Sequence, residues 1–88
     1  MEIVSKKHRF DLIEEGKIIG YLNYAERKED IDAIFIFVDP SFRGTKAKNY
    51  LLDELMTFSD TTGKKLHCTC TYMQGWFTKN KPEYLKSA

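Results

Sequence analysis

The chain has 88 residues, of which 42% are hydrophobic and 14% aromatic, and its formal net charge is +1 at pH 7. A chain of this length predicts a single domain over residues 1–88 with one core, near the lower size at which proteins fold without help. The balanced charge argues against nucleic acid as the main partner, because nucleic-acid-binding domains are usually basic.

Two features of the sequence bear on its cellular location. No apolar run approaches the roughly 20 residues of a membrane span, and the start, MEIVSKKHRF, lacks the apolar region of a secretory signal. The cysteines, Cys68 and Cys70, are two residues apart. On a strand their Cβ atoms would lie about 6.5–7 Å apart, too far for an undistorted disulfide. We therefore expect a cytoplasmic protein with free thiols and no membrane partner.

The first half of the chain predicts an antiparallel meander of three strands. Residues 8–14 alternate in polarity, residues 17–25 are rich in β-forming residues, and a charged loop follows. Residues 31–38 are apolar on both faces after Asp32, which predicts a central strand covered on both sides, and Pro40 ends it. The residues expected to share a face in each of the first two strands are Phe10 and Leu12, then Ile18, Gly20, Leu22 and Tyr24.

The second half predicts a helix, a strand and a short second helix. Apolar residues at helical spacing predict an amphipathic helix over residues 45–59, and Gly63 suits a left-handed stop. A strand follows at residues 65–71, and MQGWFTKN, residues 73–80, indicates the short helix. A strand–helix–strand crossover makes the last strand parallel to residues 31–38, so the predicted class is α+β.

The loop before the long helix carries positive charge where the helix dipole is already positive. Arg43, Lys46 and Lys48 surround the expected helix start, and Gly44 allows close approach to the backbone. Each basic residue in a first turn costs roughly 0.3–1 kcal/mol, whereas an anion is stabilised there by free N–H groups. The pattern therefore indicates an anion site, although solvated lysines beside an ordinary turn would give the same sequence.

Two segments of the sequence resemble the GCN5-related N-acetyltransferases. In FVDPSFRGTKAKNYLLDEL, Arg43 falls on the first position of their acetyl-CoA motif, Q/R-x-x-G-x-G/A, while Lys46 and Lys48 replace its two small residues. The segment LHCTCTYMQGWFTKNKPEYL is similar to the end of a short subfamily that reads strand, C-x-Y/F, short helix and N-P-x-x-Y. The residues that fit this ending are Cys70, Tyr72, Gln74, Asn80, Pro82, Tyr84 and Leu85.

The resemblance implies a minimal acetyltransferase fold that binds acetyl-CoA in a gap where the strands at residues 31–38 and 65–71 splay apart. Backbone amides near Phe37 and Val38 would hold the acetyl carbonyl, and Thr71 would lie at the opposite strand. The lysines either bind the phosphates themselves or, in the case of Lys48, block them. The residues implied to form the pyrophosphate loop are Arg43, Gly44, Thr45, Lys46, Ala47 and Lys48.

The resemblance also suggests two residues for the chemistry. Cys70 would protonate the leaving thiolate or act as a nucleophile, and Tyr72 would act as a general acid. Strand alternation puts both on the face of Cys68, a core residue, and puts His67 on the opposite face, which argues against a Cys70–His67 dyad. Simple packing is the alternative for each, and no zinc-finger spacing of Cys and His is present.

These patterns leave two main functional hypotheses. The first is an N-acetyltransferase that moves an acetyl group from acetyl-CoA to an unknown amine. The second is a non-catalytic module with a degenerate loop that serves as a CoA sensor or a protein-interaction domain. A third, an RNA-binding sheet, is disfavoured by the charge balance. An open sheet edge leaves a monomer or a weak homodimer as the expected state.

Overall fold

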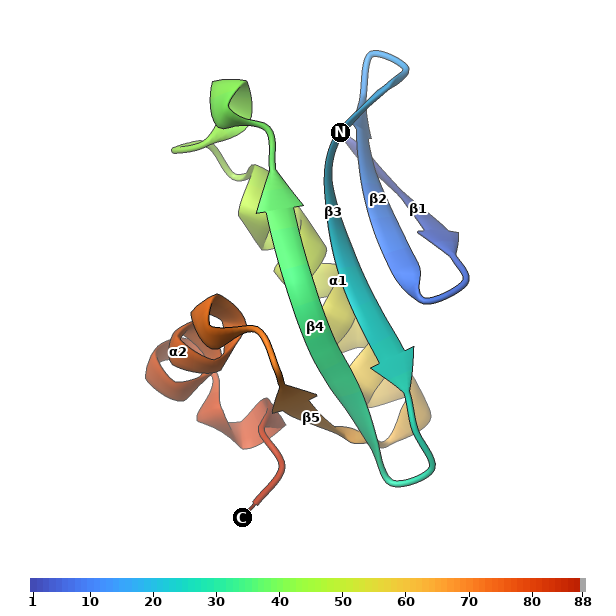
Figure 1. Ribbon diagram of the computed structural model, residues 1–88, viewed down its shortest axis with the longest axis vertical. Helices are drawn as coiled ribbons and strands as arrows, with labels where there is room; N and C mark the ends of the chain where they lie inside the picture. Colours follow the sequence, from blue (N-terminus) through green and yellow to red (C-terminus); the bar gives the residue numbers. More distant parts are fainter. Residues whose placement is uncertain (88) are drawn as a thin grey trace.

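A mixed sheet with one long helix along one face forms the framework of the protein (Figure 1). The computed structural model describes residues 1–87. The sheet order is β1-β2-β3-β4-β5, with β1 to β4 antiparallel and β5 parallel to β4. This arrangement confirms the predicted α+β class and the parallel final strand. The elements are β1 (Glu2–Lys6), β2 (Arg9–Glu14), β3 (Lys17–Glu26), β4 (Asp30–Val38), the 3-10 helix η1 (Pro40–Phe42), α1 (Ala47–Thr62), β5 (Lys65–Cys68), α2 (Thr71–Asn80) and the 3-10 helix η2 (Pro82–Tyr84).

The edge strand β1 is an addition to the predicted meander. It pairs with β2 along its whole length, and Ile3 lies opposite Leu12 and packs against the core. Its neighbour Val4 is on the other face and is 38% exposed. Two adjacent apolar residues among polar ones give no clear period, so this strand depends on its pairing with β2 rather than on a local pattern.

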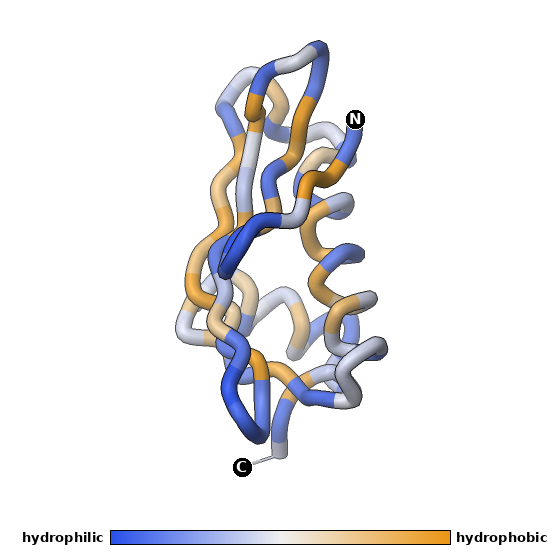
Figure 2. Tube along the Cα trace, turned by 90° about the vertical axis from the view of Figure 1, so that its right-hand side faces the viewer, coloured by the Kyte–Doolittle hydropathy of each residue, from blue (hydrophilic) through white to orange (hydrophobic). Residues whose placement is uncertain are grey.

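The core lies between α1 and one face of the sheet, and Figure 2 shows the helix running alongside the strands. The helix begins at Ala47, two residues later than expected, and ends at Thr62. Gly63 follows in the left-handed conformation with φ of 71°, and its amide donates to the Ser59 carbonyl at 2.9 Å, as predicted for the helix stop. The helix residues buried against the sheet are Ala47, Leu51, Leu52, Leu55 and Ser59.

A register shift in β2–β3 corrects one residue of the predicted core. The pairing passes from Leu12 with Gly20 to Ile13 with Ile18, so Ile19 is the extra residue. Ile19 is therefore 5% exposed, whereas Ile18 is 49% exposed instead of facing the core. A bulge of this kind reverses which side chains point inward, and strict alternation does not anticipate it.

The sheet face opposite α1 is open, so the expectation that β4 is covered on both sides was wrong. Phe35 is 47% exposed and Ile34 is 39% exposed. A second register shift pairs Asn23 with Phe35 and Tyr24 with Ala33, which leaves Ile34 as the extra residue of β4. The apolar content of β4 thus reflects an exposed aromatic surface rather than a second covering layer.

Candidate functional site

The predicted gap between the two parallel strands is present. The ladder between β4 and β5 extends from the Asp30–Lys65 pair to the Ala33–Cys68 pair, and the Cys70 amide then donates to the Ala33 carbonyl at 3.1 Å. Beyond that point β4 continues to Val38 with no strand of the described chain on its outer edge (Figure 1). A stretch of unpaired strand edge therefore lines one side of the gap.

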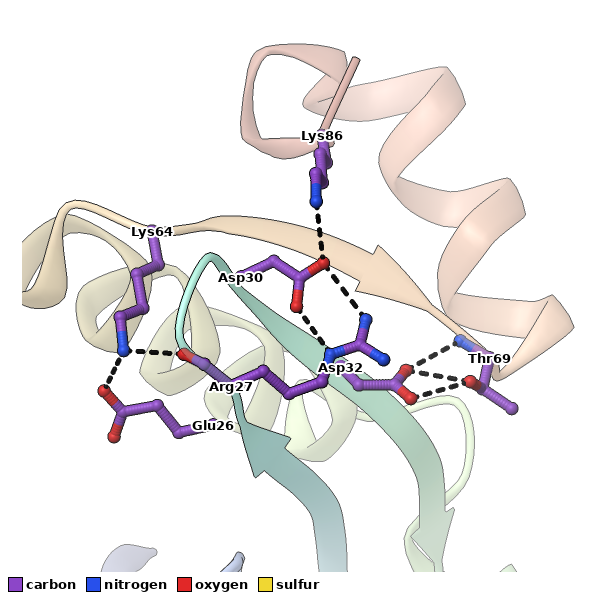
Figure 3. Close-up of polar contacts among 7 residues, drawn as sticks. All are labelled: Glu26, Arg27, Asp30, Asp32, Lys64, Thr69 and Lys86. Carbon is purple, nitrogen blue, oxygen red and sulfur yellow. Dashed lines mark hydrogen bonds and ion pairs between the residues drawn. The ribbon is translucent and has the colours of Figure 1, made fainter. Parts of the chain in front are cut away.

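At the closed end of the gap, the Asp32 side chain binds Thr69, the residue that follows β5. Its carboxylate accepts hydrogen bonds from the Thr69 amide at 3.2 Å and from the Thr69 hydroxyl at 2.8 and 3.0 Å (Figure 3). The chain turns there, with Cys70 at the N-cap of α2. Thr71 and Tyr72 therefore lie in the first turn of α2, and the expected strand over residues 65–71 was wrong beyond Cys68.

Ion pairs brace the same end of the sheet (Figure 3). The Asp30 carboxylate accepts from Arg27 Nε at 2.6 Å and lies 3.3 Å from Lys86 Nζ. On the neighbouring turn, Lys64 Nζ lies 2.7 Å from Glu26 Oε2. These contacts fasten the β3–β4 hairpin to the segments before and after α2, so the gap widens only towards the loop that follows β4.

The backbone of β4 offers hydrogen-bond donors to the gap. The Asp39 amide donates to the Ile19 carbonyl of β3 at 2.7 Å. Because donors alternate in direction along an antiparallel strand, the Phe37 amide is directed towards β3 and the amides of Ile36 and Val38 towards the gap. Of the two predicted positions, Val38 has the suitable orientation, and Ile36 is a position that sequence reasoning missed.

The loop between β4 and α1 and the first turn of α1 carry three amides with no acceptor in the described chain. They belong to Gly44 and Lys46 in the loop and to Lys48 in α1, whereas the Ala47 amide donates to the Thr45 hydroxyl at 3.2 Å. Gly44 has φ of 82°, and a Cβ there would meet no atom within 4 Å, so the surface beside it is open. Free N–H groups at a helix start favour an anion.

Side chains of the loop add charge and order. Arg43 Nε donates to the Val38 carbonyl at 3.1 Å, which fixes the loop to the end of β4. Lys46 is exposed at the N-cap of α1 and makes no capping hydrogen bond, and Ala47 is fully buried in the core. The first turn of α1 contains no acidic residue. The loop therefore combines free amides with uncompensated positive charge.

Lys48 crosses from α1 to α2. Its Nζ lies 4.1 Å from the centre of the Tyr72 ring, a cation–π contact, and Tyr72 is 43% exposed. Two cavities meet at this contact and share Val38, Arg43, Lys48 and Tyr72 in their walls. The loop cavity, about 260 Å³, adds Phe42, Gly44, Thr45 and Asn49, and the gap cavity, about 280 Å³, adds Phe35, Ile36 and Phe37.

The two thiols differ in their surroundings. Cys68 is buried in the core, as expected, and its burial, with smaller contributions from Cys70 and Asp32, raises the pKa of its thiol to about 11. Cys70 is half-buried, its carbonyl accepts the Gln74 amide at 3.0 Å, and it lines neither the loop cavity nor the gap cavity. Tyr72 therefore lies in the walls of both cavities, and Cys70 lies in the wall of neither.

Comparison with known protein families identifies the family of this chain. A family model described as GCN5-related N-acetyl-transferase matches residues 9–87. The chain belongs to this family. Membership in the GCN5-related N-acetyltransferases supports a general acetyltransferase-like function. A search of the curated proteins finds no match.

The described residues contain no group of three or more Cys, His, Asp or Glu side chains that could hold a metal ion. No helix in residues 1–87 is both long and apolar enough to cross a bilayer.

Proposed function

We propose that this protein binds acetyl-CoA and transfers the acetyl group to an amine. The observation that carries the proposal is the set of free amides and cations at the open end of the gap. The pyrophosphate would accept hydrogen bonds from the amides of Gly44, Lys46 and Lys48, beside the Arg43 and Lys48 side chains. The pantetheine arm would then run through the gap cavity along β4.

The lysines at the two small motif positions are compatible with this binding mode. A lysine keeps its backbone N–H, so replacing a glycine removes space and not a donor. The space is preserved because the Lys46 side chain is exposed and the Lys48 side chain lies against Tyr72. The amide-lined surface of the loop therefore stays open to a phosphate despite both substitutions.

The same geometry supports a mechanism for acyl transfer. The amides of Ile36 and Val38 at the strand edge would donate to the thioester carbonyl and stabilise the oxyanion that forms when an amine attacks it. The Tyr72 hydroxyl, at the opposite wall of the gap cavity, would protonate the leaving thiolate. We assign Cys70 to packing, because it lines neither cavity, and Thr71 to the start of α2.

A non-catalytic CoA-binding module is the second candidate. The contact between Lys48 and Tyr72 favours it, because both side chains stand in the walls where the loop cavity and the gap cavity meet, on the path that a pantetheine arm would follow. Such a module would bind CoA through the loop alone and would not distinguish the acetylated from the free thiol.

Calorimetry with acetyl-CoA and with CoA tests the proposal. We expect binding tighter than about 100 μM, weakened in Arg43→Ala and unchanged in Lys81→Ala, which changes an exposed lysine outside both cavities. Absence of heat at millimolar ligand would rule out the cofactor site. Binding without acetyl transfer to any amine would favour the non-catalytic module.

Variants of the proposed acid separate the chemical roles. Tyr72→Phe removes the hydroxyl and keeps the ring, so acetyl transfer should fall by about 10²–10⁴-fold while acetyl-CoA still binds. Cys70→Ala should retain transfer, and intact-protein mass spectrometry should find no acetyl group on Cys70. Loss of transfer in Cys70→Ala together with an acetylated wild-type thiol would replace Tyr72 with a cysteine nucleophile.

A further inference from the structure

The strand β1 leaves one edge of the sheet open to a further strand. It is the first strand in the sheet order, and Figure 1 shows no other segment along its outer side. Natural edge strands commonly carry a proline, a bulge or a central charge that prevents pairing with another chain. The five residues of β1, EIVSK, contain no proline, pair with β2 without a register shift, and have the half-exposed Val4 at their centre.

Hydrogen bonds within the sheet determine which backbone groups of β1 point outwards. The Tyr24 amide donates to the His8 carbonyl at 3.0 Å, so the backbone groups of the next residue, Arg9, point towards β1. Arg9 is paired with Lys6, and Lys6 therefore points its amide and carbonyl towards β2. From Lys6 the direction alternates residue by residue back along β1.

By this alternation, the residues of β1 whose amides and carbonyls point outwards are Ile3 and Ser5, on either side of Val4. Two β1 strands can therefore pair antiparallel about a twofold axis at Val4. In this register Ile3 of each copy lies opposite Ser5 of the other, and each such pair exchanges both N–H···O=C bonds. A shift by one residue would place the core face of one copy beside the open face of the other, and a shift by two would leave part of each strand unpaired.

The same register brings opposite charges together. Glu2 lies opposite Lys6 of the second copy, and the twofold axis repeats this pair at the other end of the strand. Glu2 is exposed and has no ion-pair partner among residues 1–87. The Lys6 ammonium lies 2.7 Å from Asp11 while its side chain stays 54% exposed, so a second carboxylate can reach it. Opposite charges directly across an antiparallel pair stabilise that pair.

We propose that the outer edge of β1 is a dimerisation surface whose partner is a second copy of this chain, joined antiparallel with Val4 on the twofold axis. The two sheets then form one continuous sheet with α1 of both copies on the same face, an isologous and closed contact. The inference is independent of the proposed acetyl transfer. The gap lies beside β4, at the other side of the antiparallel strands, so the dimer leaves both cavities open.

Sedimentation equilibrium of the wild-type chain and of two Ser5 variants tests the surface. We expect the wild type to dimerise with a Kd of about 100 μM, because an interface made by one short strand is small. Ser5→Pro removes an outward amide that no strand of the monomer uses, so it should keep the wild-type melting curve and remain monomeric at about 1 mM protein. Ser5→Ala keeps the amide and should dimerise like the wild type.

A charge variant tests the pairing of Glu2 with Lys6. Glu2→Lys places two lysines opposite each other at both ends of the interface, so Kd should rise by about tenfold at low salt. The difference from the wild type should shrink at high salt, because exposed charges are then screened. Glu29→Lys makes the same charge change at an exposed position outside β1 and should leave Kd unaltered.

A disulfide tests the register. In the expected dimer the two Val4 residues form a pair without hydrogen bonds, with Cα atoms about 4.5 Å apart, within the range that a disulfide spans. Val4→Cys in a Cys70→Ala background should therefore give a covalent dimer under mild oxidation. Ile18→Cys in the same background changes another exposed apolar residue of the open face, away from β1, and should not cross-link.

Three results would overturn the inference. The first is no association of the wild type at about 1 mM protein. The others are dimers of Ser5→Pro, and cross-linking of Ile18→Cys as fast as of Val4→Cys, since association would then use another surface. The proposed function is decided separately, by calorimetry with acetyl-CoA, in which Ser5→Pro should bind like the wild type.

Discussion

Replacing Lys48 with methionine is the most direct test of the loop, because it removes the ammonium and keeps an apolar stem of similar length. Within residues 1–87 the ammonium contacts the Tyr72 ring at 4.1 Å, and Tyr72 is 43% exposed. A contact at such an exposed site is worth about 0.5–1 kcal/mol. A hydrogen bond from the same ammonium to a phosphate is worth about 1.5–3 kcal/mol.

The difference between these two values sets the expected effect. Acetyl-CoA binding should weaken in Lys48→Met by about 0.5–2.5 kcal/mol, which corresponds to about 2- to 70-fold in Kd. Calorimetry at two salt concentrations measures it, and the salt dependence of the variant should be shallower because one charge contact with the ligand is gone. Lys81→Met serves as the control for removing a lysine elsewhere.

Tighter binding of acetyl-CoA by Lys48→Met would refute this reasoning. That result would mean that Lys48 obstructs the path between the loop cavity and the gap cavity, and that the loop amides alone hold the phosphates. Of the two alternatives that the sequence leaves open, obstruction by Lys48 and not phosphate binding by its ammonium would then be correct.

Three further predictions concern the framework. Gly20→Ala should lower stability by about 1–3 kcal/mol, because its Cβ would lie 2.8 Å from the Phe37 carbonyl oxygen, and an unchanged melting temperature would contradict this. Because burial raises the pKa of Cys68 from 9.0 to about 11, the stability of the wild type should fall relative to Cys68→Ala as pH rises between those values, and parallel curves in urea denaturation would exclude the effect. The Arg27 hydrogen bond lowers the pKa of Asp30 despite opposing desolvation, so its stabilisation is present above the ordinary value of 3.8 and is lost as pH falls through the lower folded value. Asp30→Asn should therefore flatten the acid limb of the stability curve, and an unaltered acid limb would contradict the assignment.

Local patterns predicted the parts of the fold that depend on local spacing. The apolar stripe of α1, the stop at Gly63 and the parallel crossover follow from helix periodicity and chain handedness. The edge strand β1 was missed because its order comes from pairing with β2. The open face of β4 was missed because exposed and doubly covered apolar residues look alike in a sequence, as Phe35 shows.

The parts of the candidate site that are contiguous in the chain were predicted, and the parts that depend on long-range contacts were not. The loop residues from Arg43 to Lys48 lie together where the motif put them, because they are contiguous in the chain. Tyr72 was expected at the site, but its place in the first turn of α2 rather than near a strand end was not foreseen, since that turn depends on the bond between Asp32 and Thr69, 37 residues apart. Ile36 was missed because its amide direction depends on a bulge that shifts the alternation of β4.

The contact between Lys48 and Tyr72 has a consequence for kinetics. The groups that stand where the two cavities meet are a pair of partly exposed side chains and not a loop or a domain. Exposed side chains change rotamer within picoseconds to nanoseconds, whereas lids and domains move in microseconds to milliseconds. Opening is therefore faster than any diffusional encounter with a ligand. Ligand association should rise linearly with concentration in stopped-flow experiments, without the plateau that a slow conformational step imposes.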